Sequence, residues 1–194
     1  MAPIASHHLM ESPPLEGPTT TVKRELAAKS ALTTASPPSA PCLVTDFIRY
    51  QVQTNPNALA VHCEHEEPCT YSDLWHIVEQ IFLNARFAGG SIVPVCLDIG
   101  IEFVATLLAI MVSGAAYVIF DPEGSQERNR AIASDTSADS VVSSLKYASS
   151  FERVVLVEDL LSTEAAPGHL ISPLAVPGPS PSDLAYLIYT SGKC

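Results

Sequence analysis

Two hydroxyl residues and a glycine near the end of the chain have the types and spacing of a phosphate-binding turn. Thr190, Ser191 and Gly192 directly follow an apolar run, residues 184–189, that contains aromatic and branched side chains. Such a run is typical of a buried strand. The glycine lets the backbone approach an anion, and hydroxyl and N–H groups donate hydrogen bonds to it. The pattern predicts an anion-binding turn, although a buried strand ending in an ordinary Ser-Gly turn would have the same sequence.

The segments that would position this turn alternate between strands and helices. Strands are expected at 92–97, 116–120, 140–142, 154–157 and 184–189, and the helices between them at 74–85, 102–112 and 128–133. This order predicts an α/β fold, with an open, mostly parallel sheet and helices on both faces. In such sheets ligands bind at the carboxyl ends of strands. Residues 190–192 follow one of those ends.

Local signals refine several elements. Thr45-Asp46 is expected to provide the N-cap of a short helix that runs to about Val52, and residues 58–71 form a predicted hairpin. The spacing Thr70-x-x-Asp73 predicts a capping box at the start of the helix over 74–85. Pro94 lacks a backbone donor, so the strand that contains it is expected at an edge of the sheet or at a bulge. The His and Cys residues of the hairpin match no common zinc spacing, and we assign no metal ligand.

Composition excludes several classes of protein. The chain has 194 residues, is 47% hydrophobic and has a mean hydropathy of +0.22, which indicates a globular protein with a core. Its formal net charge is −11. The acidic balance argues against nucleic acid or an anionic membrane as a partner. Five cysteines without a regular framework, and an N-terminus without a signal-peptide pattern, predict reduced thiols and a cytoplasmic location.

The first 41 residues differ from the rest of the chain. They hold seven of the 16 prolines, together with many Ser and Thr residues and no sustained apolar periodicity. Such a segment cannot bury enough apolar surface to offset its chain entropy, so we expect a disordered tail over 1–41. The folded domain is expected over 42–194, with a proline-rich linker at 162–182.

One apolar run is long enough to suggest a membrane span. Residues 103–120 are almost all uncharged and mostly apolar. However, Ser113-Gly114 would end a helix in the middle of the run, and no basic residue flanks it. A buried helix followed by a buried strand is therefore favoured.

Four segments occur in an order that is shared with one enzyme family. They are Cys69–Leu74, Leu107–Val118 with Asp121-Pro122 after it, Glu127-Arg128, and Asp183–Gly192. Together they resemble the adenylation (AMP-binding) domains of nonribosomal peptide synthetases, in the adenylate-forming superfamily. The resemblance implies ATP with Mg²⁺ as cofactor, a carboxylic or amino acid as substrate, and a carrier-protein domain as partner. It also implies that Thr190, Ser191 and Gly192 begin the ATP phosphate loop.

The departures from this family are equally informative. Ile119 stands where a proline is usual, Gly124-Ser125 replaces a Tyr-Pro pair, and Pro94 replaces a small residue. Lys193 and Cys194 occupy the positions of two hydroxyl residues of the loop. The family's adenine pocket, acid-selecting pocket and catalytic lysine correspond to no residue here, so we assign no catalytic residue. The expectation is a truncated adenylation domain whose family reaction forms an acyl-adenylate but which is inactive alone.

Two other functions fit parts of the sequence. One is a non-catalytic, acidic α/β interaction module, which would bind a protein partner and ignore ATP. The other is a fragment of an acyl-CoA synthetase-type ligase, because Tyr189–Gly192 alone does not separate the branches of the superfamily. Amino-acid-dependent exchange of pyrophosphate into ATP would distinguish an active enzyme from both.

Overall fold

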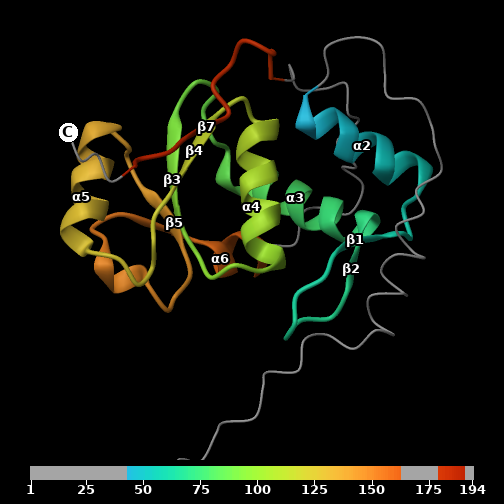
Figure 1. The fold of residues 1–194 in the computed structure, drawn as a ribbon, viewed down its shortest axis with the longest axis horizontal. Helices are drawn as coiled ribbons and strands as arrows, with labels where there is room; N and C mark the ends of the chain where they lie inside the picture. The colour runs from blue at the N-terminus through green and yellow to red at the C-terminus, as the bar shows by residue number, and fades with distance from the viewer. Residues whose placement is uncertain (1–42, 163–178, 191–194) are drawn as a thin grey trace, which may run out of the picture. The chain divides into compact units, whose positions relative to one another are not determined.

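The computed structural model describes residues 43–162 and 179–190. Its strands are β1 (Leu59–Val61), β2 (Cys69–Thr70), β3 (Ile92–Cys96), β4 (Ala116–Ile119), β5 (Val141–Ser143), β6 (Val154–Leu156) and β7 (Tyr186–Leu187). Five of them form a parallel sheet in the order β6-β5-β3-β4-β7, and β1 and β2 form a separate antiparallel hairpin (Figure 1). The predicted tail over 1–41 and most of the predicted linker lie outside the described residues.

Helices lie on both faces of the large sheet, as predicted. They are α2 (Val44–Thr54), α3 (Tyr71–Ala85), α4 (Ile101–Val112), α5 (Gln126–Asp135) and α6 (Val157–Ser162). In Figure 1, α3, α4 and α6 lie on one side of the sheet and α5 lies on the other. Buried residues of α3, α4 and α6 form one apolar cluster with the sheet, while α5 contributes to a second cluster. Alternation along β3 explains the two clusters, since Val95 belongs to the first and its neighbour Cys96 to the second.

The predicted capping box at the start of α3 is present. The Thr70 side chain accepts from the Asp73 backbone N–H at 3.2 Å, and the Asp73 carboxylate accepts from the Thr70 N–H at 3.2 Å. The Thr70 hydroxyl also donates to the Asp73 carboxylate at 2.6 Å, and this bond, together with the one from the Thr70 N–H, lowers the pKa of Asp73 below its ordinary value. Reciprocal capping satisfies two backbone donors that a helix start otherwise leaves free. The apolar stripe of α3 then packs on the core, with Leu74, Val78 and Ile81 buried.

Helix α4 and strand β4 account for the long apolar run. The helix ends at Val112, and Gly114 follows with φ +76°, a left-handed conformation that suits glycine. The chain then enters β4 at Ala116. Within the part of the chain that the structure describes, no helix has the length and apolar character needed to cross a bilayer.

The expectation for Pro94 is wrong. Its strand, β3, lies in the centre of the sheet, and Pro94 is buried. Successive residues of a strand direct their backbone groups to opposite neighbours. The Val95 carbonyl accepts from Phe120 after β4, so Pro94 faces β5. The β3–β5 ladder begins only at Val95, paired with Val142, so the missing N–H falls just outside the ladder.

Several boundaries also differ from the predictions. Helix α2 has Leu43 at its N-cap rather than Thr45, and the Asp46 carboxylate accepts from the Leu43 N–H at 3.1 Å. Val157 begins α6 instead of ending a strand. Strand β7 is an edge strand of two residues and not a buried run, and Ile188 beyond it is 73% exposed.

Candidate functional site

The predicted phosphate turn begins at the carboxyl end of β7. The register pairs Tyr117 with Tyr186 and Val118 with Leu187 in parallel, so β7 ends at the same edge as β4. Thr190 follows three residues later, and its side chain is exposed. Thr190 therefore lies where α/β sheets place ligand-binding turns. Ser191 and Gly192 lie outside the described residues.

Helix α5 contacts the residue that precedes this turn. The Arg128 guanidinium donates through Nη2 to the Tyr189 carbonyl at 2.7 Å. The Tyr189 hydroxyl donates to the carboxylate of Asp135, the last residue of α5. Because the carboxylate favours the protonated phenol, the pKa of Tyr189 is raised. Both ends of Tyr189, its carbonyl and its hydroxyl, are thus bound by one helix.

The same helix is attached to the neighbouring strand end. The Asn129 side chain, 6% exposed, donates to the Asp121 carbonyl just beyond β4 at 3.1 Å. Ser125, one of the departures from the family pattern, is the N-cap residue, and its hydroxyl accepts from the Arg128 N–H at 3.4 Å. Serine is among the preferred N-cap residues. These two hydrogen bonds place the start of α5 at the carboxyl edge of the sheet.

A cavity of about 750 Å³ lies between α5 and the two strands β4 and β7. Apolar side chains of Ile119 and Leu187 line it, with Arg128 and Asn129 on the side of α5. A cationic guanidinium bound to the residue before the exposed Thr190 suits an anionic ligand. Among the described residues, these groups have the chemistry expected of a site for an anionic phosphate group.

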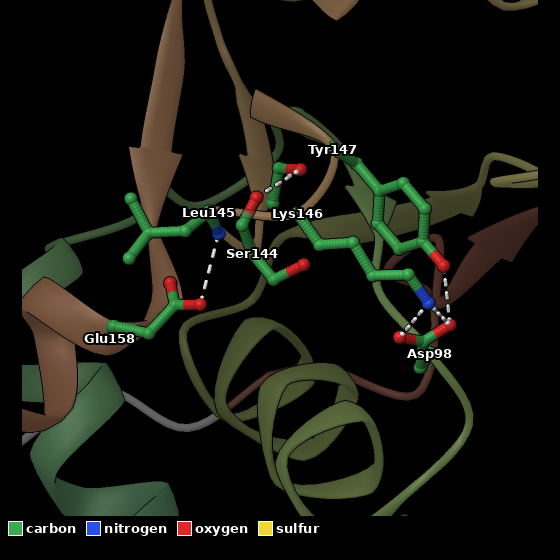
Figure 2. Close-up of polar contacts among 7 residues, drawn as sticks. Asp98, Ser144, Leu145, Lys146, Tyr147 and Glu158 are labelled. Carbon is green, nitrogen blue, oxygen red and sulfur yellow. Dashed lines mark hydrogen bonds and ion pairs between the residues drawn. The ribbon is translucent and has the colours of Figure 1, made fainter. Parts of the chain in front are cut away.

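A second polar cluster, which we name the Asp98 cluster, consists of Asp98, Lys146 and Tyr147 (Figure 2). Asp98 follows β3, and the other two residues follow β5. Lys146 Nζ lies 2.9 Å from Asp98 Oδ2, and the Tyr147 hydroxyl donates to Asp98 Oδ1 at 2.5 Å. Lys146 Nζ also lies 4.7 Å from the centre of the Tyr147 ring. The cluster joins two loops at the carboxyl edge of the sheet.

The pKa shifts in the Asp98 cluster favour a structural role, joining two loops, over a catalytic one. The Tyr147 and Lys146 hydrogen bonds lower the pKa of Asp98, and the acceptance by Asp98 raises the pKa of Tyr147. A phenol with a raised pKa stays protonated near neutral pH and is a poor general base. Next to the Asp98 cluster, the Leu145 N–H donates to the Glu158 carboxylate of α6 at 2.9 Å (Figure 2). This hydrogen bond connects the loop after β5 to α6.

Sequence reasoning missed the Asp98 cluster and the contacts of α5 with Tyr189. Asp98 lies 48 residues from Lys146, and Arg128 lies 61 residues from Tyr189. Such distant pairs leave no periodic signal. The one usable indication was position, because Asp98 and Tyr189 both come at the ends of predicted strands, whose carboxyl ends share one edge in a parallel sheet.

The fold and site together define a class: an open parallel α/β domain with a candidate anion-binding turn at the carboxyl edge of its sheet. The sequence narrows this to one family. Residues 48–192 match the family described as AMP-binding enzyme, and the chain belongs to that family.

Among curated proteins, the similarity is to nonribosomal peptide synthetases. The chain is 50% identical over 193 residues to nonribosomal peptide synthetase sidE of Aspergillus fumigatus, which covers all of this chain and 9% of that protein. It is 30% identical over 159 residues to tyrocidine synthase 3 of Brevibacillus parabrevis, covering 77% of this chain and 2% of the relative. The chain therefore spans less than a tenth of these relatives. It corresponds to part of an adenylation domain of the synthetase type.

Solved structures show the same fold. The nonribosomal peptide synthetase FmoA3 superposes with a TM-score of 0.66 at 22% identity, over 87% of this chain and 18% of that one. The N-terminal subdomain of Klebsiella oxytoca NpsA gives 0.65 at 21% identity, over 77% and 39%. O-succinylbenzoate CoA synthetase from Bacillus subtilis, in complex with ATP and magnesium, gives 0.56 at 17% identity, over 61% and 34%. The predicted fold and family are confirmed.

Proposed function

We propose that this chain supplies the first part of the ATP phosphate site of an adenylation domain. The observation that carries the proposal is the position of Thr190, exposed after β7 at the carboxyl edge of the sheet and inside the stretch 48–192 that matches the family. Thr190, Ser191 and Gly192 would donate hydroxyl and backbone hydrogens to phosphate oxygens. The reaction served is the activation of an amino or other carboxylic acid as an acyl-adenylate, with release of pyrophosphate.

The residues present suit the phosphates better than they suit a metal. Thr190 offers an exposed hydroxyl, and Arg128 brings a cation to the adjacent Tyr189 carbonyl. Mg²⁺ bound with a nucleotide keeps phosphate oxygens and water as most of its ligands. We therefore assign the magnesium to the nucleotide and no metal ligand to this chain. When bound, ATP with Mg²⁺ supplies the electrophilic phosphate that the acid attacks.

The acid substrate and the carrier-protein partner belong to the same proposal. Both are properties of complete synthetases, and the chain covers 9% of one of them. We further propose that residues 42–194 form a single adenylation-type domain in the cytoplasm, preceded by a separate tail. The chain alone is expected to bind Mg-ATP weakly and to catalyse no exchange, because adenylyl transfer depends on positioning groups that the chain does not contain.

The test is a titration of the full chain with Mg-ATP, followed by ³¹P NMR line broadening. We expect weak, saturable broadening for the wild type and its loss in the double variant Thr190→Val, Ser191→Ala. Thr54→Val is the control, because its hydroxyl donates to the Tyr50 carbonyl in α2, which belongs to neither β4, β7 nor α5. Equal broadening in the double variant would refute the assignment of the turn.

A second measurement tests the proposed lack of turnover. Amino-acid-dependent exchange of labelled pyrophosphate into ATP is expected to stay at background with the purified chain. Robust exchange would show that the chain is an enzyme by itself. A chain that binds a protein partner with defined stoichiometry and shows no response to Mg-ATP would instead support the interaction module.

A further inference from the structure

The segment that leads to the proposed phosphate turn leaves the sheet earlier than its apolar sequence suggests. Pairing between β7 and β4 covers only Tyr186 and Leu187. Beyond Leu187 the described chain has no ladder to hold it, and Ile188 is 73% exposed. A two-residue ladder at a sheet edge fixes the direction of the chain poorly. Some other contact must determine where Thr190 lies.

Helix α5 supplies that contact. Two residues past the end of the ladder, the Tyr189 carbonyl accepts from Arg128 at 2.7 Å and the Tyr189 hydroxyl donates to Asp135. A guanidinium-to-carbonyl hydrogen bond is charge-assisted and therefore stronger than a neutral one. Because Arg128 and Asp135 lie on one helix, their two bonds restrain both the position and the rotation of Tyr189.

Helix α5 can hold Tyr189 in place, and so act as a brace for it, only if the helix is itself fixed to the sheet. Asn129, next to Arg128, is 6% exposed and donates to the Asp121 carbonyl at the end of β4. Ile132 is also 6% exposed and lies in the apolar cluster with Val118 and Phe120. The sheet holds the carboxyl end of β4, but its ladder does not extend to Tyr189 after β7. Helix α5 links the two segments.

We propose that Arg128 is a positioning residue for the phosphate turn, and that Asp135 assists it through the Tyr189 hydroxyl. The inference rests on the proposed function, since it identifies what orients the same turn. Loss of the Arg128 hydrogen bond would free the Tyr189 carbonyl to rotate, and Thr190 follows it directly. Thr190 would then sample positions in which its hydroxyl is not directed at a bound phosphate.

The experiment compares three variants of the full chain. Arg128→Ala removes the hydrogen bond and the charge, and Arg128→Lys keeps a cation that can still donate to the carbonyl. Arg130→Ala is the matched control: it removes the same charge from the same helix, and the described structure records no hydrogen bond or ion pair for its side chain. Thermal unfolding of each variant shows whether the fold is intact.

The first readout is amide hydrogen exchange in the peptide that covers residues 184–190. We expect faster exchange there in Arg128→Ala, with Arg128→Lys intermediate and Arg130→Ala equal to the wild type. Unchanged exchange in Arg128→Ala would overturn the proposal. This readout needs no nucleotide, so it decides the positioning role even if the chain proves not to bind ATP.

The second readout is the Mg-ATP titration. Loss of one hydrogen bond predicts a dissociation constant raised roughly fivefold in Arg128→Ala, with partial rescue by lysine. A raised constant with an unchanged unfolding temperature separates positioning from general destabilisation. Wild-type binding with no change in Arg128→Ala would refute the positioning role alone, whereas no broadening in the wild type would count against the proposed function.

Discussion

Strands β3 and β7 belong to the same parallel sheet but are held in place by different forces. Strand β3 pairs on both sides, and its residue Val95 is 0% exposed. Among the described residues, strand β7 pairs with β4 alone; Tyr186 in it is 51% exposed, and Ile188 just after it is 73% exposed. Apolar burial stabilises the first strand. At the exit of the second strand, Tyr189 packs only partly buried against the second apolar cluster, and polar contacts with α5 hold it as well.

The difference separates stability from function within one sheet. Elements that bind ligands are usually drawn from the less stable parts of a fold, because they must adjust to what they bind. Here the buried centre of the sheet holds α5 in place, and α5 in turn holds Tyr189, the residue before the turn. The following predictions test this division, beginning with the largest effect.

Ile110→Ala should be the most destabilising of these changes. Ile110 is 0% exposed and lies in the large cluster between α4 and the sheet. Truncating such a side chain leaves a cavity and is expected to lower the free energy of unfolding by about 2–5 kcal/mol. Ile188→Ala, the same change at the exposed edge, should stay within about 0.5 kcal/mol. Urea unfolding followed by circular dichroism measures both.

Equal costs for the two isoleucines would contradict the comparison. In that case residues beyond β7 would contribute to the core as much as α4 does, and the brace through α5 would be unnecessary. A small loss in Ile110→Ala would mean that the large cluster is loosely packed.

Ile188→Lys should change association rather than stability. An edge strand with exposed apolar side chains invites pairing with another chain, and a lysine at such an edge opposes it. We expect poor solubility of the wild type and a clearly higher monomeric concentration of the variant in size-exclusion chromatography. Val44→Lys, at a 62% exposed position in α2, is the control for added charge. An equal gain from both would point to net charge and away from the β7 edge.

The alternation of apolar segments predicted the architecture because it depends on local periodicity. Helix stripes and buried strands are visible in windows of about ten residues, and the capping box at Thr70 and the stop at Gly114 are local as well. The sheet and its two-sided cover of helices followed from these signals.

Features that depend on strand order could not be predicted in this way. Pro94 was expected at an edge or a bulge because the sequence does not reveal that β3 is central and that its ladder with β5 begins at Val95. The hydrophobicity of 184–189 predicted burial, but burial also needs a neighbour on each side, and β7 has one in the described structure. The contacts of Arg128 and Asp98 likewise depend on loops brought together by the fold.

Gly114→Ala is expected to cost about 1 kcal/mol, because its φ of +76° is unfavourable for a residue with a β-carbon. The glycine sits between α4 and β4, so the strain would fall on the connection to the stable centre of the sheet. Gly89→Ala is the matched control: its added β-carbon would meet only the Ser113 carbonyl at 3.4 Å, an ordinary contact. A loss of the same size at both positions would contradict the conformational explanation.

The smallest expected effect is the pH dependence contributed by the Asp98 cluster. Its hydrogen bonds with Tyr147 and Lys146 hold the pKa of Asp98 below the ordinary value of 3.8. A lowered pKa means that the folded state favours the carboxylate, so this contribution is present above that value and is lost as the pH falls through the folded pKa. The contribution is small because Asp98 and Lys146 are 62% and 63% exposed and solvent screens their attraction.

Asp98→Asn should therefore lower stability slightly at neutral pH and converge with the wild type in acid. Urea unfolding between pH 3 and 7 measures the difference, with Asp139→Asn as a charge-matched control, since the described structure records no hydrogen bond or ion pair for the Asp139 side chain. A difference that grows as the pH falls would have the wrong sign for a stabilised carboxylate. No difference at any pH would mean that the Asp98 carboxylate does not help to hold the loops after β3 and β5 together.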